Sequence, residues 1–142
     1  MIIGYTTGVF DLFHIGHLNL LKNARALCDR LIVGVTTDEL VSYKNKKAVI
    51  PFEERIEIVR NIKYVDAAVP QLTMDKLDAW HRLKFDIMFV GDDWYGSDKW
   101  KDIQNQLESE HGVRVIYFPY TSGVSSTLIN ETLFKLRAQV TV

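Results

Sequence analysis

Two histidines near the N-terminus, His14 and His17, are the side chains in this sequence best suited to chemistry. They follow a strand-like run at residues 2–7 and stand where an amphipathic helix is expected to begin, at residues 16–28. Positions i and i+3 share one face of a helix. Unpaired backbone N–H groups and the positive end of the helix dipole collect phosphates at such a helix start. Imidazoles there can donate to a phosphate and stabilise charge that develops during a reaction.

Surface histidines that cap a helix are the simpler interpretation. A lone histidine would fit it, but a pair that follows a glycine at a strand-to-helix turn favours a phosphate site. Gly8 lacks a Cβ, so we expect it to let a phosphate approach the main chain.

A second phosphate cradle is expected near the C-terminus, where a hydroxyl-rich turn opens a helix. An ordinary helix cap is the alternative. The candidate ligands of this turn are Thr121, Gly123, Ser125, Ser126 and Thr127, with Tyr120 directly before them.

A third motif, Asp92-Asp93-Trp94, follows an apolar strand-like run and Gly91. The carboxylates could help to hold Mg²⁺ or accept hydrogen bonds from a base, a ribose or basic groups. Trp94 could shelter a nucleotide. The alternative is a capped turn with a packing tryptophan.

Basic residues gather between positions 44 and 63. A solvated charged loop and a helix with one polar face would explain most of them. Lysines on a loop above the site could also close over a triphosphate and neutralise it. The basic residues are Lys44, Lys46, Lys47, Arg55, Arg60 and Lys63.

Strand-like and helical patterns alternate along the chain. This alternation predicts an α/β fold: one Rossmann-like domain with about five parallel strands and helices on both faces of the sheet. Ligands of such sheets bind beyond the carboxyl ends of the strands, where the motifs above would converge. The expected strands are 2–7, 31–36, 64–69, 86–90 and 113–118, and the expected helices are 16–28, 51–62, 74–83, 97–111 and 125–138.

Composition narrows the choice of class. The length of 142 residues suits one domain, and a net charge of −1 argues against a general nucleic-acid binder. The only cysteine, Cys28, is expected to be a buried thiol. No run approaches a membrane span, and the N-terminus reads as a strand, so we expect a cytoplasmic protein with no membrane partner.

The pattern G-x-F-D-L-x-H-x-G-H at residues 8–17 resembles the nucleotide-binding signature of the cytidylyltransferase family, and most of all its small bacterial glycerol-3-phosphate branch. The literal H-I-G-H also occurs in class I aminoacyl-tRNA synthetases, which are far longer. The resemblance implies nucleotide contacts by Gly8, Val9, Phe10, Asp11, His14, Ile15, Gly16 and His17, and by the 92–94 and 120–127 motifs.

The same resemblance assigns the basic residues. It implies that Lys46 contacts the CTP phosphates and acts in catalysis beside the two histidines. It also implies that the acceptor is bound by Lys44, Arg55, Lys63 and Lys76. The sequence departs from the family at Tyr120, where an arginine is usual, and at Met74, where a tryptophan is usual.

The activity that the resemblance implies is transfer of CMP from CTP to a small alcohol phosphate, glycerol 3-phosphate above all, with Mg²⁺ accompanying CTP. Relatives have a dimer contact near a segment like Tyr64-Val65-Asp66, so a homodimer is expected. An adenylyltransferase and a catalytically silent nucleotide-binding module are the alternatives.

Overall fold

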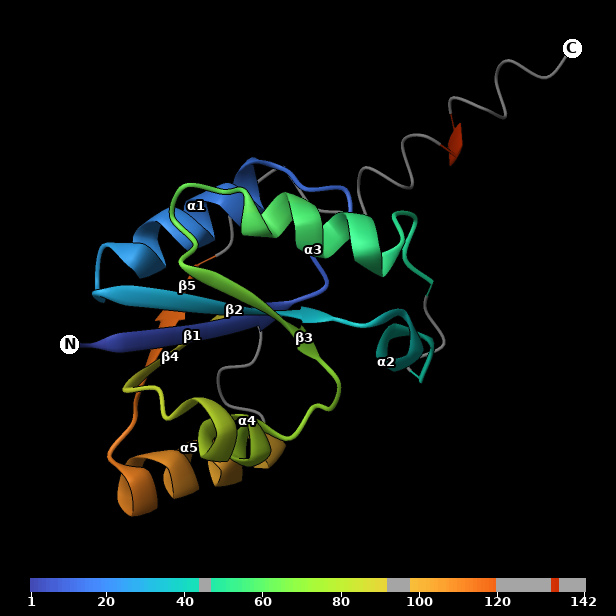
Figure 1. Cartoon of the computed structure of the whole chain (residues 1–142). Helices are drawn as coiled ribbons and strands as arrows, with labels where there is room; N and C mark the ends of the chain where they lie inside the picture. The colour runs from blue at the N-terminus through green and yellow to red at the C-terminus, as the bar shows by residue number, and fades with distance from the viewer. Residues whose placement is uncertain (44–46, 92–97, 120–133, 136–142) are drawn as a thin grey trace, which may run out of the picture.

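A five-stranded, fully parallel sheet forms the centre of the computed structural model, which describes residues 1–43, 47–91, 98–119 and 134–135 (Figure 1). The strands lie in the order β3-β2-β1-β4-β5. The first strand, β1, is therefore central, and the chain runs outward from it in both directions. The strands are β1 (Ile3–Gly8), β2 (Arg30–Thr36), β3 (Ala67–Gln71), β4 (Ile87–Gly91) and β5 (Arg114–Phe118).

Helices cover both faces of the sheet. In Figure 1, α1 (Ile15–Arg25) and α3 (Phe52–Arg60) lie above the sheet, and α4 (Lys76–Leu83) and α5 (Asp98–His111) lie below it. A short helix, α2 (Asp38–Tyr43), follows the carboxyl end of β2. Among the described residues, no helix is long and apolar enough to cross a membrane.

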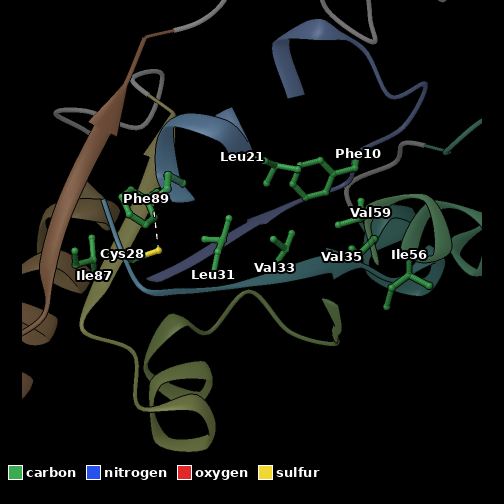
Figure 2. Close-up of a cluster of buried hydrophobic side chains, with 11 residues drawn as sticks. Phe10, Leu21, Cys28, Leu31, Val33, Val35, Ile56, Val59, Ile87 and Phe89 are labelled. Atoms are coloured by element: carbon green, nitrogen blue, oxygen red, sulfur yellow. Dashed lines mark hydrogen bonds between the residues drawn. The ribbon is translucent and has the colours of Figure 1, made fainter. Parts of the chain in front are cut away.

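Each face of the sheet has its own apolar core because alternate residues of a strand point to opposite faces. Leu31, Val33 and Val35 of β2 pack with α1 and α3 (Figure 2), whereas Ile32 packs with α4 and α5 on the other face. The sheet is buried on both sides, which is the usual condition of a parallel sheet. The predicted fold class is therefore confirmed.

Several described elements differ from the expected ones; for example, α1 ends at Arg25 rather than Cys28. The third strand begins at Ala67 rather than Tyr64, because Asp66 bonds outside the strand: its carboxylate accepts the amide of Leu31 and pairs with Arg25. Helix α2 was not expected. The predicted helix 125–138 lies outside the described residues except for 134–135, which are helical.

Candidate active site

The two histidines of the signature cap the first helix together. His14 is the N-cap residue of α1, and its Nδ1 accepts the backbone N–H of Gly16 at 3.0 Å. The Nδ1 of His17 accepts the backbone N–H of His14 in turn, at 3.2 Å. This is a capping box built from two imidazoles instead of a hydroxyl and a carboxylate.

These bonds fix the tautomer of both rings. A backbone N–H can only donate, so each Nδ1 must be an acceptor and each neutral imidazole carries its proton on Nε2. The two rings are stacked, with centroids 3.9 Å apart. Burial, reinforced by the neighbouring His14, lowers the pKa of His17 to about 4, and burial lowers the pKa of His14 as well. Near pH 7 the site therefore presents two neutral N–H donors.

Aromatic rings support His17 from the side. The rings of Phe10 and Phe13 each lie 5.3 Å from its imidazole, and Phe10 is almost fully buried. The turn is strained, because Phe10 and Leu12 both have left-handed backbones, with φ of 55° and 49°. A Cβ at Gly8 would meet the Phe10 ring at 3.0 Å. The structure thus differs from the expectation for Gly8: on that side the missing Cβ makes room for the Phe10 ring rather than for a phosphate.

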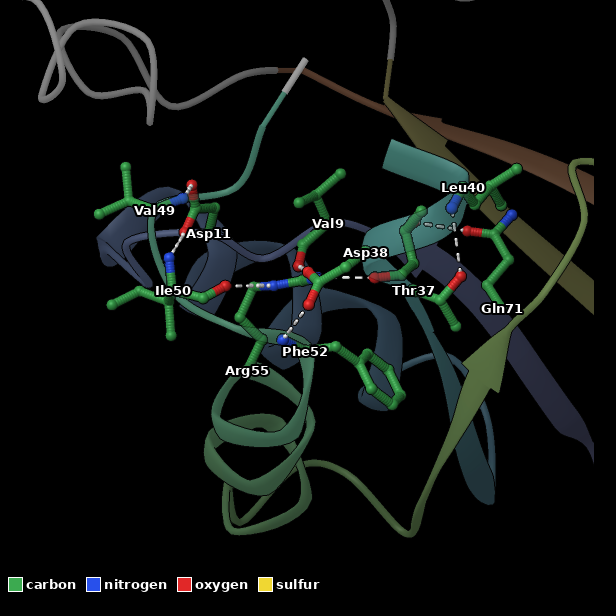
Figure 3. Close-up of polar contacts among 11 residues, drawn as sticks. Val9, Asp11, Thr37, Asp38, Leu40, Val49, Ile50, Phe52, Arg55 and Gln71 are labelled. Carbon is green, nitrogen blue, oxygen red and sulfur yellow. Dashed lines mark hydrogen bonds and ion pairs between the residues drawn. The ribbon is translucent and has the colours of Figure 1, made fainter. Parts of the chain in front are cut away.

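Asp11, expected near the nucleotide, anchors a neighbouring segment in this structure. Its carboxylate oxygens accept the backbone N–H groups of Val49 and Ile50 at 2.8 and 2.9 Å (Figure 3). These two residues follow the predicted lysine loop closely in the chain. The carboxylate thus ties the downstream end of that loop to the turn that carries the histidines.

Arg55 lies at the junction of four segments. Its guanidinium donates to the carbonyl oxygens of Val9, Thr36 and Ile50 and to the carboxylate of Asp38, all at 2.6–2.8 Å (Figure 3). The residue is only 1% exposed. This position differs from the expected one: the guanidinium is bound by the protein itself and is not presented to an acceptor substrate.

Asp38 completes the junction. Its second carboxylate oxygen accepts the N–H of Phe52, at the start of α3. That hydrogen bond and the Arg55 guanidinium hold the pKa of Asp38 below its ordinary value. Sequence reasoning missed Asp38, although an acidic residue directly after β2 together with an arginine in the first turns of α3 was a usable signal.

Lys76 reaches the same edge of the sheet from the opposite face. It begins α4 and is nearly buried, and its Nζ donates to the Thr7 hydroxyl at 3.0 Å. Thr7 is the penultimate residue of β1. The structure therefore places the Lys76 ammonium group beside Thr7, at the carboxyl edge of the sheet.

The structure does not bring Lys63 to this edge. Helix α3 runs back along the sheet from Pro51, and Lys63 follows it, three residues before Asp66. The backbone N–H of Asp66 bonds the Leu31 carbonyl, at the amino-terminal end of β2. Within one chain, Lys63 thus lies toward the opposite end of the strands from the histidines.

The remaining signature residues contribute main-chain groups. Val9 accepts a bond from Arg55 through its carbonyl, Gly16 donates its N–H to His14, and the Ile15 side chain is half exposed. Eleven other predicted residues lie outside the described ranges, and they remain predictions: Lys44, Lys46, Asp92, Asp93, Trp94, Tyr120, Thr121, Gly123, Ser125, Ser126 and Thr127.

The described residues contain no group of three or more histidine, cysteine or acidic side chains that could hold a metal ion. The carboxylates beside the turn, Asp11 and Asp38, accept hydrogen bonds from the protein. Mg²⁺ retains several waters and usually binds through one or two carboxylates and substrate phosphates.

Known proteins are similar to this chain in sequence and fold. Residues 5–132 match the cytidylyltransferase-like family. A glycerol-3-phosphate cytidylyltransferase of Bacillus subtilis is 39% identical, over 90% of this chain and 94% of its own. An FAD synthase of Pyrococcus horikoshii is also 39% identical, over 80% of this chain and 77% of its own.

A solved structure agrees with this placement. It is described as a lipopolysaccharide core biosynthesis protein from Thermoplasma volcanium and superposes with a TM-score of 0.71 at 27% identity, covering 85% of this chain and 97% of its own. Sequence and fold thus lead to one conclusion. The chain belongs to the cytidylyltransferase-like family of nucleotidyltransferase enzymes.

Proposed function

We propose that this enzyme transfers CMP from CTP to a small alcohol phosphate, with glycerol 3-phosphate as the first candidate. The observation that carries the proposal is the capping box of His14 and His17, which leaves two Nε2–H donors at the start of α1. Neutral donors at a helix N-terminus suit the bridging and non-bridging oxygens of a polyphosphate.

The reaction needs no covalent enzyme intermediate. A phosphate oxygen of the acceptor attacks the α-phosphorus of CTP in line, and a new P–O–P bond forms. The bond from the α-phosphorus to the bridging oxygen breaks, and pyrophosphate leaves with the electron pair. The two Nε2–H groups stabilise the charge that develops on the phosphate oxygens. A phosphate monoester is already an anion near neutral pH, so no general base is required.

Magnesium enters this scheme with the substrate. Bound together with CTP, Mg²⁺ would neutralise part of the charge on the triphosphate. Of the predicted contacts, Lys46 and the hydroxyls between residues 121 and 127 would hold the same phosphates, and Asp92 or Asp93 would assist.

The acceptor site is proposed on the α4 face of β1. Lys76 supplies the positive charge for the acceptor phosphate there, with the Thr7 hydroxyl as its partner. We retain Lys44 as a second contact. Glycerol 3-phosphate is the first acceptor to test because three relatives between 35% and 39% identical are named for it.

Adenylyl transfer is the second candidate. Relatives named FAD synthases are 36–39% identical over up to 80% of this chain. Tyr120, where the cytidylyltransferase family has an arginine, also leaves the choice of nucleotide to experiment.

Pyrophosphate release with Mg²⁺ tests both candidates. CTP and ATP are each paired with glycerol 3-phosphate, phosphocholine, phosphoethanolamine, polyol phosphates and FMN. We expect CTP with glycerol 3-phosphate to give the highest kcat/KM. Turnover of ATP with FMN alone would establish the second candidate instead. CTP binding in a calorimeter without turnover of any acceptor would leave only a silent binding module.

We also propose that the enzyme is a cytoplasmic homodimer. Light scattering during gel filtration should give twice the 16.4 kDa mass of the chain.

A further inference from the structure

Polar side chains end three neighbouring strands on the face of the sheet that α4 covers. Thr7 of β1 is in register with Gly34, which precedes Thr36 of β2 by two residues, and Thr36 is in register with Gln71 of β3. Residues in register share a face, as do residues two apart in a strand. Thr7, Thr36 and Gln71 therefore line one side of the carboxyl edge.

Gln71 is an unusual member of this set. It is 5% exposed, and its Oε1 accepts the Thr36 hydroxyl at 2.8 Å (Figure 3). Its Nε2 donates to the thioether sulfur of Met74 at 3.7 Å. A thioether is a weak acceptor. The Thr36 hydroxyl thus orients the buried amide through Oε1. The weaker hydrogen bond from Nε2 to the Met74 sulfur could readily be replaced by one to an oxygen atom.

The loop after Gln71 brings this amide toward the proposed acceptor site. Only four residues separate Gln71 from Lys76, whose ammonium group bonds Thr7 on the same face. An anionic group held by Lys76 would therefore carry its organic portion along the strand ends that bear Thr36 and Gln71. A neutral amide N–H suits a neutral oxygen there, because a second anion would call for a second cation.

We propose that Gln71 is a specificity-determining residue whose Nε2 donates a hydrogen bond to a hydroxyl group of the acceptor. This hydroxyl replaces the Met74 sulfur as the hydrogen-bond acceptor of Nε2. This inference rests on the proposed function, and it adds the recognised chemistry: a phosphate monoester whose carbon chain bears a free hydroxyl. A site built to bond a hydroxyl disfavours analogues that lack it, because the buried donor then stays poorly paired.

Acceptor analogues test the assignment. Glycerol 3-phosphate is compared with 3-hydroxypropyl phosphate, which lacks the secondary hydroxyl, and with 2-hydroxypropyl phosphate, which lacks the primary one. We expect wild-type kcat/KM to fall about tenfold for one of the two analogues, the value of one hydrogen bond. In Gln71→Met, glycerol 3-phosphate should become no better than that analogue, within about twofold, while KM for CTP stays unchanged.

Two further variants separate recognition from folding. Thr36→Val removes the bond that orients the amide and should weaken the discrimination between acceptors in the same direction as Gln71→Met, though less. Gln106→Met, on the exposed side of α5, is the matched control and should retain the wild-type ratio.

The outcomes are distinguishable. If the active wild type does not prefer glycerol 3-phosphate over either analogue, the assignment of Gln71 alone is overturned. The same holds if Gln71→Met keeps the full wild-type preference for glycerol 3-phosphate. A wild-type protein that transfers CMP to phosphocholine or phosphoethanolamine but to none of these three acceptors also overturns the inference alone. A protein that transfers CMP to no acceptor of the wider screen overturns the proposed function and this inference with it.

Discussion

Two pairs of histidines lie at opposite ends of the strands, and the two pairs make different contacts. His14 and His17 cap α1 at the carboxyl edge of the sheet, with each Nδ1 bound to a backbone N–H. His81 and His111 lie in the last turns of α4 and α5, toward the amino-terminal edge.

The histidines of the second pair pack against a tryptophan and against each other. His111 stacks on Trp80 with centroids 3.8 Å apart, and His81 meets His111 edge-on at 5.5 Å. The Lys84 ammonium group lies 4.0 Å from the Trp80 ring. These contacts join α4 to α5.

The difference is the reason why we propose phosphate chemistry for the first pair and not for the second. Both pairs touch other aromatic rings, so ring contacts do not distinguish them. In the first pair both Nδ1 atoms accept main-chain amides at a helix start, which leaves Nε2–H as the remaining donor of each ring where the helix dipole favours an anion. The second pair lies at helix ends, where the dipole favours cations.

The largest difference between the two ends of the sheet is expected in the stability lost when a nearby arginine is replaced. Arg55→Met leaves three carbonyls and a carboxylate beside the first pair without their donor, and should lower the free energy of unfolding by about 3–5 kcal/mol. Arg82→Met, near the second pair, removes only an exposed ion pair with Asp78 and should cost less than about 1 kcal/mol. Urea unfolding measures both. Equal losses would remove Arg55 from its anchoring role.

His17 should respond to the shape of its replacement. Asparagine can keep the acceptor near the Nδ1 position but has no donor near Nε2, so His17→Asn should fold and lose at least about a hundredfold in kcat. His17→Gln can restore an N–H near Nε2 and should recover part of that loss.

Matched changes in the second pair give the control. His81→Asn and His111→Asn should each leave kcat within about twofold of wild type. A His17→Asn enzyme with normal turnover would show that the imidazole donor is not needed for the reaction.

A smaller effect is expected from His17 on how the free energy of unfolding changes with pH. His17 has a folded pKa of about 4 against an ordinary value of 6.5, so the unfolded chain binds more protons between these values. Its contribution is complete above pH 6.5 and is lost as the pH falls toward 4. Between pH 7 and pH 5 wild type should therefore lose about 2 kcal/mol more stability than His17→Asn. Parallel losses in the two proteins would show that His17 titrates normally.

The smallest effect is expected from the stacking of the second pair. His111→Ala removes the ring on Trp80 and should lower the free energy of unfolding by about 1 kcal/mol, with kcat/KM unchanged. A clear fall in kcat/KM would mean that the amino-terminal edge communicates with the site.

Hydrophobic periodicity predicted the alternating fold, because a sheet buried on both faces requires apolar strands and helices with one apolar side. The histidine pair was predictable as well, since its spacing and its place after a strand are local features. The role of Arg55 was not, because no local pattern reveals that a guanidinium will be buried among carbonyls from three segments. The Thr36–Gln71 pair escaped for the same reason: it depends on the register of β2 with β3.

Long-range ¹H–¹⁵N NMR spectra of the imidazoles, recorded near pH 7, test most directly whether His14 and His17 are neutral donors to a nucleotide. The structure predicts that both rings are Nε2–H tautomers in the free enzyme and that both Nε2 resonances shift when Mg·CTP is added, while His81 and His111 stay in place. An Nδ1–H tautomer at either signature histidine, or rings that do not respond to saturating Mg·CTP, would contradict this account.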